Sequence, residues 1–105
     1  MRVLFDQGTP VPLRKYLTSH TVVTVYENGW SRMRNGELLV LAEAQGYEIF
    51  ITTDQNLKYQ QNLMDRKIAI VVLSTTSWPI IEKQVSKITL ALDSTVAGSY
   101  TEIDF

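Results

Sequence analysis

The sequence predicts an α/β fold in which a mainly parallel sheet of four to five strands is covered by helices on both faces. Runs of β-branched and apolar residues alternate with segments of helical spacing, the order that gives a parallel sheet with right-handed crossovers. Residues 68–73 are apolar throughout, as expected of a strand at the centre of such a sheet. Because 45% of the 105 residues are hydrophobic and 20% are charged, we expect a single domain over residues 1–105.

Two strands and a helix are expected at the start of the chain. Residues 2–5 form a short β-rich run that ends at Asp6, where Gly8 and two prolines stop the strand. Residues 11–17 have apolar side chains at helical spacing, and the prolines lie at the start, where a missing N–H costs nothing. Residues 21–26 are mostly β-branched and predict the second strand.

A helix and a third strand follow in the middle of the chain. Asn35 and Gly36 begin a segment with leucines along one face, and Gly46 is a typical residue to end it. Residues 48–52 predict a strand that leads towards Asp54. Residues 55–67 are polar, and we expect them to hold a short helix.

The last third of the chain predicts a strand, a helix and a final extended segment. Residues 68–73 are the clearest strand, and residues 74–77 form a loop. A helix begins near Trp78, and its apolar residues lie four, three and four positions apart, which predicts one buried stripe. The stripe consists of Ile81, Val85, Ile88 and Leu92. Gly98 ends this pattern, and residues 100–105 form an edge strand or trail free.

Composition excludes several classes of site. Without cysteine the chain has neither disulfides nor a thiolate zinc site, and the single histidine, His20, excludes zinc sites that need two imidazoles. The net charge is −1, but all ten Lys and Arg residues precede residue 88, so the body is weakly basic and could accept an anionic substrate. Scattered, solvated charges explain the same pattern. Because the apolar runs are too short for a signal peptide or a membrane span, we expect a cytoplasmic protein without a membrane partner.

Two aspartates follow two separate predicted strands. A single aspartate in such a place commonly caps a helix or begins a turn. Parallel sheets, however, bind their ligands at the carboxyl ends of the strands, so Asp6 and Asp54 converge if their strands are neighbours. Crowded carboxylates stay ionised when a cation joins them, and oxygen ligands suit Mg²⁺ or Mn²⁺. Such a metal orients a phosphodiester and lowers the pKa of an attacking water.

Four short motifs occur in the same order as in a known group of proteins. They are Leu4-Phe5-Asp6, His20-Thr-Val, Asn35-Gly-Glu-Leu-Leu-Val-Leu-Ala42 and Ile51-Thr-Thr-Asp-Gln-Asn56. Over roughly the first three quarters of the chain this order resembles the small PIN-like toxin components of bacterial type II toxin–antitoxin pairs. The resemblance implies a PIN-like three-layer α/β/α sandwich and a metal-dependent endoribonuclease.

The resemblance also implies site residues and partners. Asp6 and Asp54 match acidic residues that hold one or two Mg²⁺ or Mn²⁺ ions, and Glu37 is the nearby carboxylate that completes the metal-binding and catalytic set. Asn35 and Asn56 stand where the group has aspartates, and they are expected to coordinate through neutral oxygens or to bind substrate. The implied partners are the RNA substrate, a small cognate antitoxin protein and a second copy in a homodimer.

Further residues are candidates for RNA contact. Arg32 and Arg34 flank the start of the helix that carries Glu37 and could meet phosphates, although a solvated loop pair needs no function. Tyr59 could stack on a base or pack against the protein. His20 precedes a strand, away from the strand ends that carry the aspartates, and is expected to be a turn or surface residue.

Two other functions fit the same pattern. The missing acids at Asn35 and Asn56 are compatible with a decayed PIN-like module that binds a partner protein or RNA without cleavage. Phosphoacceptor signalling domains also place aspartates after the first and third strands. They normally pair acids after the first strand, where this chain has Gln7, and carry a lysine after a late strand, which residues 74–79 lack.

Overall fold

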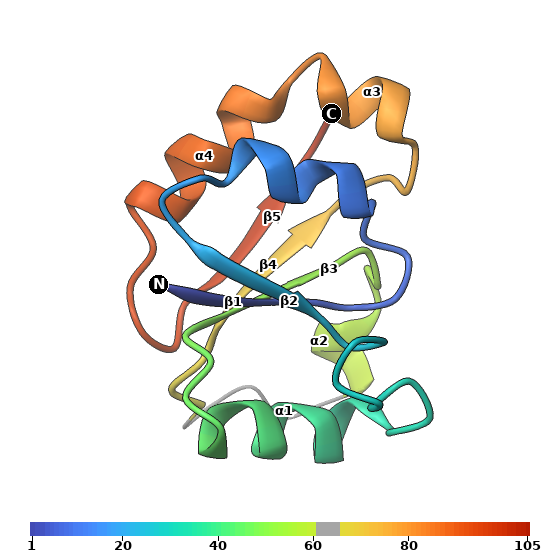
Figure 1. The fold of residues 1–105 in the computed structure, drawn as a ribbon, viewed down its shortest axis with the longest axis vertical. Coiled ribbons are helices and arrows are strands. Elements are labelled where there is room, and N and C mark those ends of the chain that lie inside the picture. Colours follow the sequence, from blue (N-terminus) through green and yellow to red (C-terminus); the bar gives the residue numbers. More distant parts are fainter. Residues whose placement is uncertain (61–65) are drawn as a thin grey trace.

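A computed structural model describes residues 1–60 and 66–105, except for the side chains of residues 59 and 60. Within these residues, five strands form one sheet between two helical layers, a three-layer α/β/α sandwich (Figure 1). The elements are β1 (Arg2–Phe5), the 3₁₀ helix η1 (Val11–Tyr16), β2 (Thr21–Thr24), α1 (Asn35–Ala44), β3 (Ile49–Thr52), α2 (Leu57–Gln60), β4 (Ala69–Leu73), α3 (Trp78–Glu82), α4 (Val85–Asp93) and β5 (Tyr100–Ile103). The α/β class and the parallel sheet predicted from the sequence are confirmed.

The sheet has the strand order β2-β1-β3-β4-β5, and every pair is parallel. From β1 the chain first adds β2 on one side and then places β3 on the other. The connections therefore reverse direction between β1 and β3, and open α/β sheets bind ligands at such a switch point. The strand predicted over residues 68–73 is wholly buried and lies between β3 and β5, so it is an interior strand, while the middle position belongs to β3.

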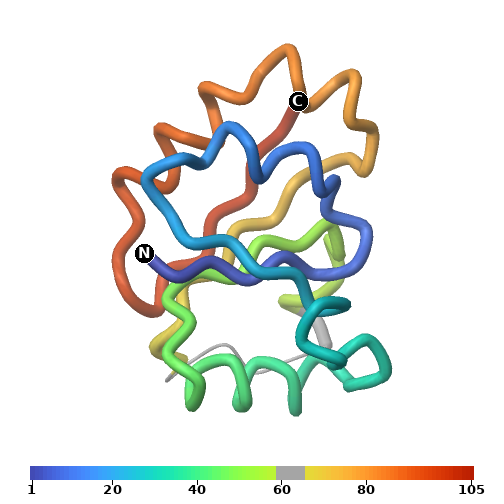
Figure 2. Tube along the Cα trace, viewed as in Figure 1, coloured from blue at the N-terminus to red at the C-terminus, as the bar shows by residue number. Residues whose placement is uncertain are grey.

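Helical layers cover the two faces of the sheet (Figures 1 and 2), and an apolar core lies on each face. Val3, Phe5 and Ile51 face η1, α3 and α4, whereas Leu4 and Phe50 face α1 and α2. Side chains alternate between the faces of a strand. The residues that follow Phe5 and Ile51 therefore turn towards the α1 layer at the carboxyl edge of the sheet.

Three predicted elements differ in the structure, and two of them lie in the first third of the chain. The helix predicted over residues 11–17 is a 3₁₀ helix, in which Leu13 N–H and Leu17 N–H bond to carbonyls three residues earlier. The second strand ends at Thr24 instead of residue 26, because the Thr24 and Glu27 side chains each accept the other residue's backbone N–H.

The single helix predicted from Trp78 onwards is wrong, because the chain forms α3 and α4 with a break at residues 83–84. Across this break the N–H groups of Gln84 and Lys87 bond to carbonyls three residues earlier, which tightens the backbone out of the α-helical path. The apolar stripe is nevertheless core: Ile81, Ile88 and Leu92 are buried and Val85 packs against them.

Residues 100–103 form the edge strand β5, which pairs in parallel with β4. Of the helices in the described residues, none has the length and apolar content needed to cross a membrane.

Candidate functional site

The two strand-end aspartates lie beside each other because β1 and β3 are neighbours in the sheet. Thr52, the last residue of β3, is fully buried, and its hydroxyl donates a hydrogen bond to Oδ2 of Asp6 (2.8 Å). The same hydroxyl oxygen accepts the backbone N–H of Asp54 (3.1 Å). One side chain thus joins the ends of both strands, and the predicted convergence of Asp6 and Asp54 is present.

The Asp6 carboxylate is half-buried, and hydrogen bonds fix both of its oxygens. Besides the bond from Thr52 to Oδ2, the backbone N–H of Gln7 donates to Oδ1 (2.9 Å). Burial raises the pKa of Asp6, the two hydrogen bonds lower it, and the negative charge of Asp54 raises it further. The net result is a raised pKa, so Asp6 holds a proton more tightly than an ordinary aspartate.

The Asp54 carboxylate is oriented by its own loop and by α1. Its Oδ1 accepts the backbone N–H of Asn56 (3.0 Å), and its Oδ2 accepts the side-chain amide of Asn35 (3.1 Å). Since Asn35 is the first residue of α1, the carboxylate lies at the positive end of this helix, where negative charge is favoured. The Asn35 amide nitrogen faces Asp54, and no donor in the described part of the chain reaches its oxygen.

Glu37 is not brought to the aspartates. It follows Asn35 by two positions on α1, which turns its side chain about 200° around the helix axis. It is exposed and lines a groove on the outer side of α1 with Met33 and Val40. Across residues 1–60 and 66–105, no three acidic or histidine side chains are grouped closely enough to share a metal ion.

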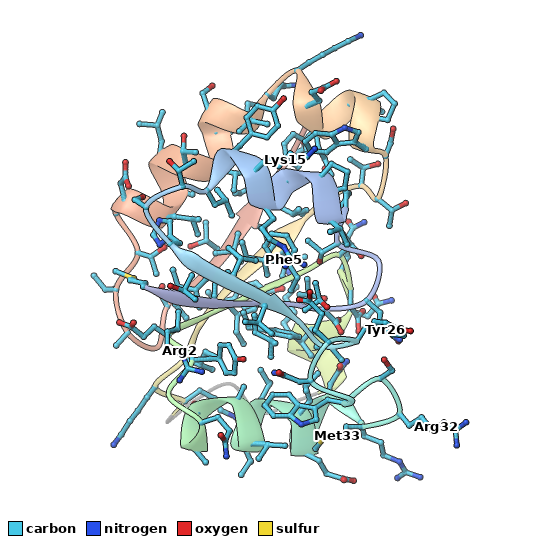
Figure 3. All side chains as sticks on the ribbon, viewed as in Figure 1. Arg2, Phe5, Lys15, Tyr26, Arg32 and Met33 are labelled. Atoms are coloured by element: carbon cyan, nitrogen blue, oxygen red, sulfur yellow. The ribbon has the colours of Figure 1, made fainter. Side chains whose placement is uncertain are left out.

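Of the other residues predicted from the sequence, Asn56 contacts the site only through its backbone, and the remaining described side chains lie away from the two aspartates. Asn56 contributes its backbone N–H to Asp54, while its side chain is exposed. Arg32 and Arg34 are exposed in the segment before α1, and Figure 3 shows Arg32 extending away from the molecule. The side chain of Tyr59 lies outside the described residues. His20 is half-buried just before β2, at the opposite end of the strands.

Thr52 is the site residue that the sequence analysis missed. A threonine at the end of an apolar strand is explained by strand propensity alone. The informative signal is its position: it stands next to Asp6 in the β1–β3 register, since Phe5 pairs with Ile51. That register is known only once the two strands are known to be neighbours.

The loops after β1 and β3 pack tightly against each other beside the carboxylates. The hydroxyl of Thr9 is buried and donates to the carbonyl of Ile51 (3.0 Å). Gly8 adopts a φ of +89°, and a β-carbon there would lie 2.8 Å from Oγ1 of Thr53. Only glycine fits this approach without a shift of the neighbouring loop. The loop that carries Asp6 and Gln7 is thereby held in one position.

The donor set suits a hard divalent cation. Asp6 and Asp54 offer carboxylate oxygens that each accept one hydrogen bond and keep a second lone pair, and Asn35 adds an amide oxygen. Mg²⁺ in proteins is typically bound by one or two carboxylates, by waters and by substrate phosphates, so two carboxylates are sufficient. Burial is the main cause of the raised pKa of Asp6, and the smaller contribution, repulsion by Asp54, is the kind that a cation relieves.

Comparisons of the chain with protein-family models, with curated proteins and with solved structures found no significant match.

Proposed function

We propose that the chain is a metal-dependent endoribonuclease that hydrolyses RNA phosphodiesters at the Asp6–Asp54 pair and acts as the toxin of a toxin–antitoxin pair. The observation that carries the proposal is the bridge formed by the Thr52 hydroxyl, which joins the Asp6 carboxylate to the backbone N–H of Asp54 at the switch point of a parallel sheet. A small cognate antitoxin follows from the resemblance to PIN-like toxins, and the cytoplasm is proposed as the location because the apolar runs of the sequence are short.

Each residue of the site has a defined task in this proposal. Asp6 and Asp54 would hold Mg²⁺ or Mn²⁺, which when bound supplies positive charge for the phosphate and lowers the pKa of a coordinated water. Thr52 orients Asp6, and Asn35 orients Asp54.

The test is cleavage of labelled tRNA and mRNA by purified protein with Mg²⁺, with Mn²⁺ and with EDTA. Cleavage should require the metal and should fall by at least about 100-fold in Asp6→Asn and Asp54→Asn. Asp93→Asn is the matched control, since Asp93 is an exposed aspartate at the end of α4. Undiminished cleavage in either site variant, or metal-independent cleavage, would overturn the proposal.

A binding module without cleavage is the second candidate. It is favoured by the low charge of the site, because Glu37 faces away and the Asn35 amide already contacts Asp54. In this case no divalent ion would produce cleavage, and the folded protein would bind RNA or a partner protein saturably. The cleavage assay therefore separates the two candidates directly.

A phosphoacceptor domain is the third candidate, and the strand order supports it, since flavodoxin-like sheets have the order β2-β1-β3-β4-β5. Asp54 would be the acceptor and Asp6 its acidic neighbour. The loop after β4 carries no lysine, however, and Asp6 is followed by Gln7. Labelling of Asp54 by acetyl phosphate would establish this function, and its absence would exclude it.

A further inference from the structure

A groove of about 440 Å³ lies beside Asp6, between the loops that follow β1 and β2. Asp6 forms part of its wall, so the groove adjoins the candidate site at this residue, whereas Asp54 does not line it. Its volume falls within the range of small-ligand sites in proteins, about 300–1,000 Å³. The proposed function does not account for this groove, because hydrolysis needs only the phosphate at Asp6 and Asp54.

The groove combines an apolar surface with a polar rim. Val11 and Tyr26, which are 53% and 79% exposed, supply the exposed apolar surface above the buried Phe5 and Val25. Gln7 and Glu27, both among the lining residues, add polar groups. This combination matches a nucleobase, whose faces are apolar and whose edges carry hydrogen-bond donors and acceptors. Gln7 is exposed, and its side-chain amide offers both a donor and an acceptor.

Tyr26 lines the same groove and is 79% exposed. It follows β2 and projects at the side of the molecule where the loop after β1 turns back (Figure 3). An aromatic ring this exposed gains little from packing within the protein. It is well suited to stack on a base, because every base presents a π-face.

The charges near the groove do not oppose an RNA ligand at this place. Arg14 donates two hydrogen bonds to the Glu27 carboxylate (3.2 and 3.1 Å), which offsets the negative charge at the rim. A base is itself uncharged, and the phosphate next to it would lie towards Asp6, where the proposed cation binds. The base would therefore contact the groove, and the phosphate would lie at a separate place next to Asp6.

We propose that this groove binds one nucleobase of the RNA, stacked on Tyr26 with its edge towards Gln7, so that the adjoining phosphate lies at Asp6 and Asp54. The inference rests on the proposed function for its ligand, RNA. It adds to that function a base-binding subsite, and hence a source of preference for the base next to the cleaved bond.

The experiment is a titration of the ¹⁵N-labelled protein with AMP, GMP, CMP and UMP, followed by amide chemical shifts in EDTA. Saturable shifts are expected at residues 7–9 and 25–27, the backbone that lines the groove. Ribose 5-phosphate is the control ligand and should not produce them, because it lacks a base. Equal shifts with ribose 5-phosphate would overturn the inference.

Variants of Tyr26 give a second measurement. Tyr26→Ala should weaken mononucleotide binding about tenfold, and Tyr26→Phe should change it less than about twofold, because the phenylalanine keeps the ring. Tyr16→Ala is the matched control, since Tyr16 is an exposed tyrosine that contacts Trp78 and does not line the groove. Unchanged binding by Tyr26→Ala would overturn the inference.

The outcomes separate this inference from the proposed function. Metal-dependent cleavage without base binding in the groove would retain the ribonuclease and remove the subsite. Base binding in the groove without cleavage under any metal would retain the subsite and remove the ribonuclease, in favour of the binding module.

Discussion

Thr52 Oγ1 lies 2.8 Å from Asp6 Oδ2, a hydrogen bond between residues 46 positions apart in the sequence. Because Thr52 also accepts the backbone N–H of Asp54, one buried hydroxyl contacts both the Asp6 carboxylate and the backbone of Asp54. The candidate site is therefore built into the β1–β3 pairing of the sheet, and changes to it should be measurable as changes in folding stability.

Thr52→Val should destabilise the protein by about 1–2 kcal/mol, because valine keeps the shape of threonine but leaves the Asp54 N–H and one Asp6 oxygen without their partner. Urea unfolding monitored by circular dichroism measures the change. Thr101→Val on the edge strand β5 is the control and should alter stability by less than about 0.5 kcal/mol. Equal effects of the two substitutions would show that the hydroxyl of Thr52 has no special role.

The free energy of unfolding of Asp6→Asn, relative to that of the wild type, should increase as the pH rises through the pKa of Asp6. The folded-state pKa of Asp6 is raised, mainly by burial, so the folded protein binds this proton more tightly than the unfolded chain does. The cost of ionising Asp6 is absent below its unfolded pKa, develops as pH rises through the folded pKa and is fully present above it.

The asparagine carries no charge and avoids this cost, so its gain relative to the wild type should disappear as the pH falls below the ordinary aspartate pKa of about 3.9. Unfolding in urea over a pH series measures both proteins. A stability difference between the two proteins that stays constant over the pH series would contradict the raised pKa.

Gly8→Ala should destabilise the protein more than Gly29→Ala does. Both glycines have positive φ (+89° and +74°), which costs about 1–2 kcal/mol for an alanine. The new β-carbon at Gly8 would also lie 2.8 Å from Thr53 Oγ1, whereas nothing lies within 4 Å at Gly29. The difference between the two variants in urea unfolding isolates the loop–loop contact, and a difference of zero would show that the loop adjusts freely.

The architecture and part of the site were predictable from sequence, for identifiable physical reasons. Strands of a parallel sheet are apolar runs with sharp ends, so the positions of Asp6 and Asp54 at strand ends could be read directly. The orientation of Glu37 was accessible from helical periodicity, but its closeness in sequence to Asn35 suggested a shared site instead. The role of Thr52 depends on strand register, which short apolar strands do not encode locally.

The break between α3 and α4 could not be predicted because the apolar stripe continues across it. Periodicity records which side chains are buried and is insensitive to a short change of backbone path at residues 83–84. The groove beside Asp6 was equally inaccessible, since its walls come from two loops that meet only after β2 has paired with β1.

Asn35→Asp provides the sharpest test of the metal site. Without metal, the substitution replaces the amide that donates to Asp54 with a second carboxylate, so we expect a loss of about 2 kcal/mol in EDTA from the lost bond and the new repulsion. With Mg²⁺ the added ligand should increase affinity, and stabilisation by a bound ligand grows with the ratio of its concentration to its Kd. The rise in melting temperature between EDTA and Mg²⁺ should therefore be larger for Asn35→Asp than for the wild type.

The control for this measurement is Gln45→Glu, which adds a carboxylate just after the other end of α1. It should show the same Mg²⁺ response as the wild type, since it lies far along the helix from Asp54. If Mg²⁺ raises the melting temperatures of all three proteins equally, the ion acts on surface charge in general and Asp54 does not belong to a metal site. A rise that is present in the wild type and in Gln45→Glu, and larger in Asn35→Asp, would instead show that Asp54 and residue 35 lie at one cation position.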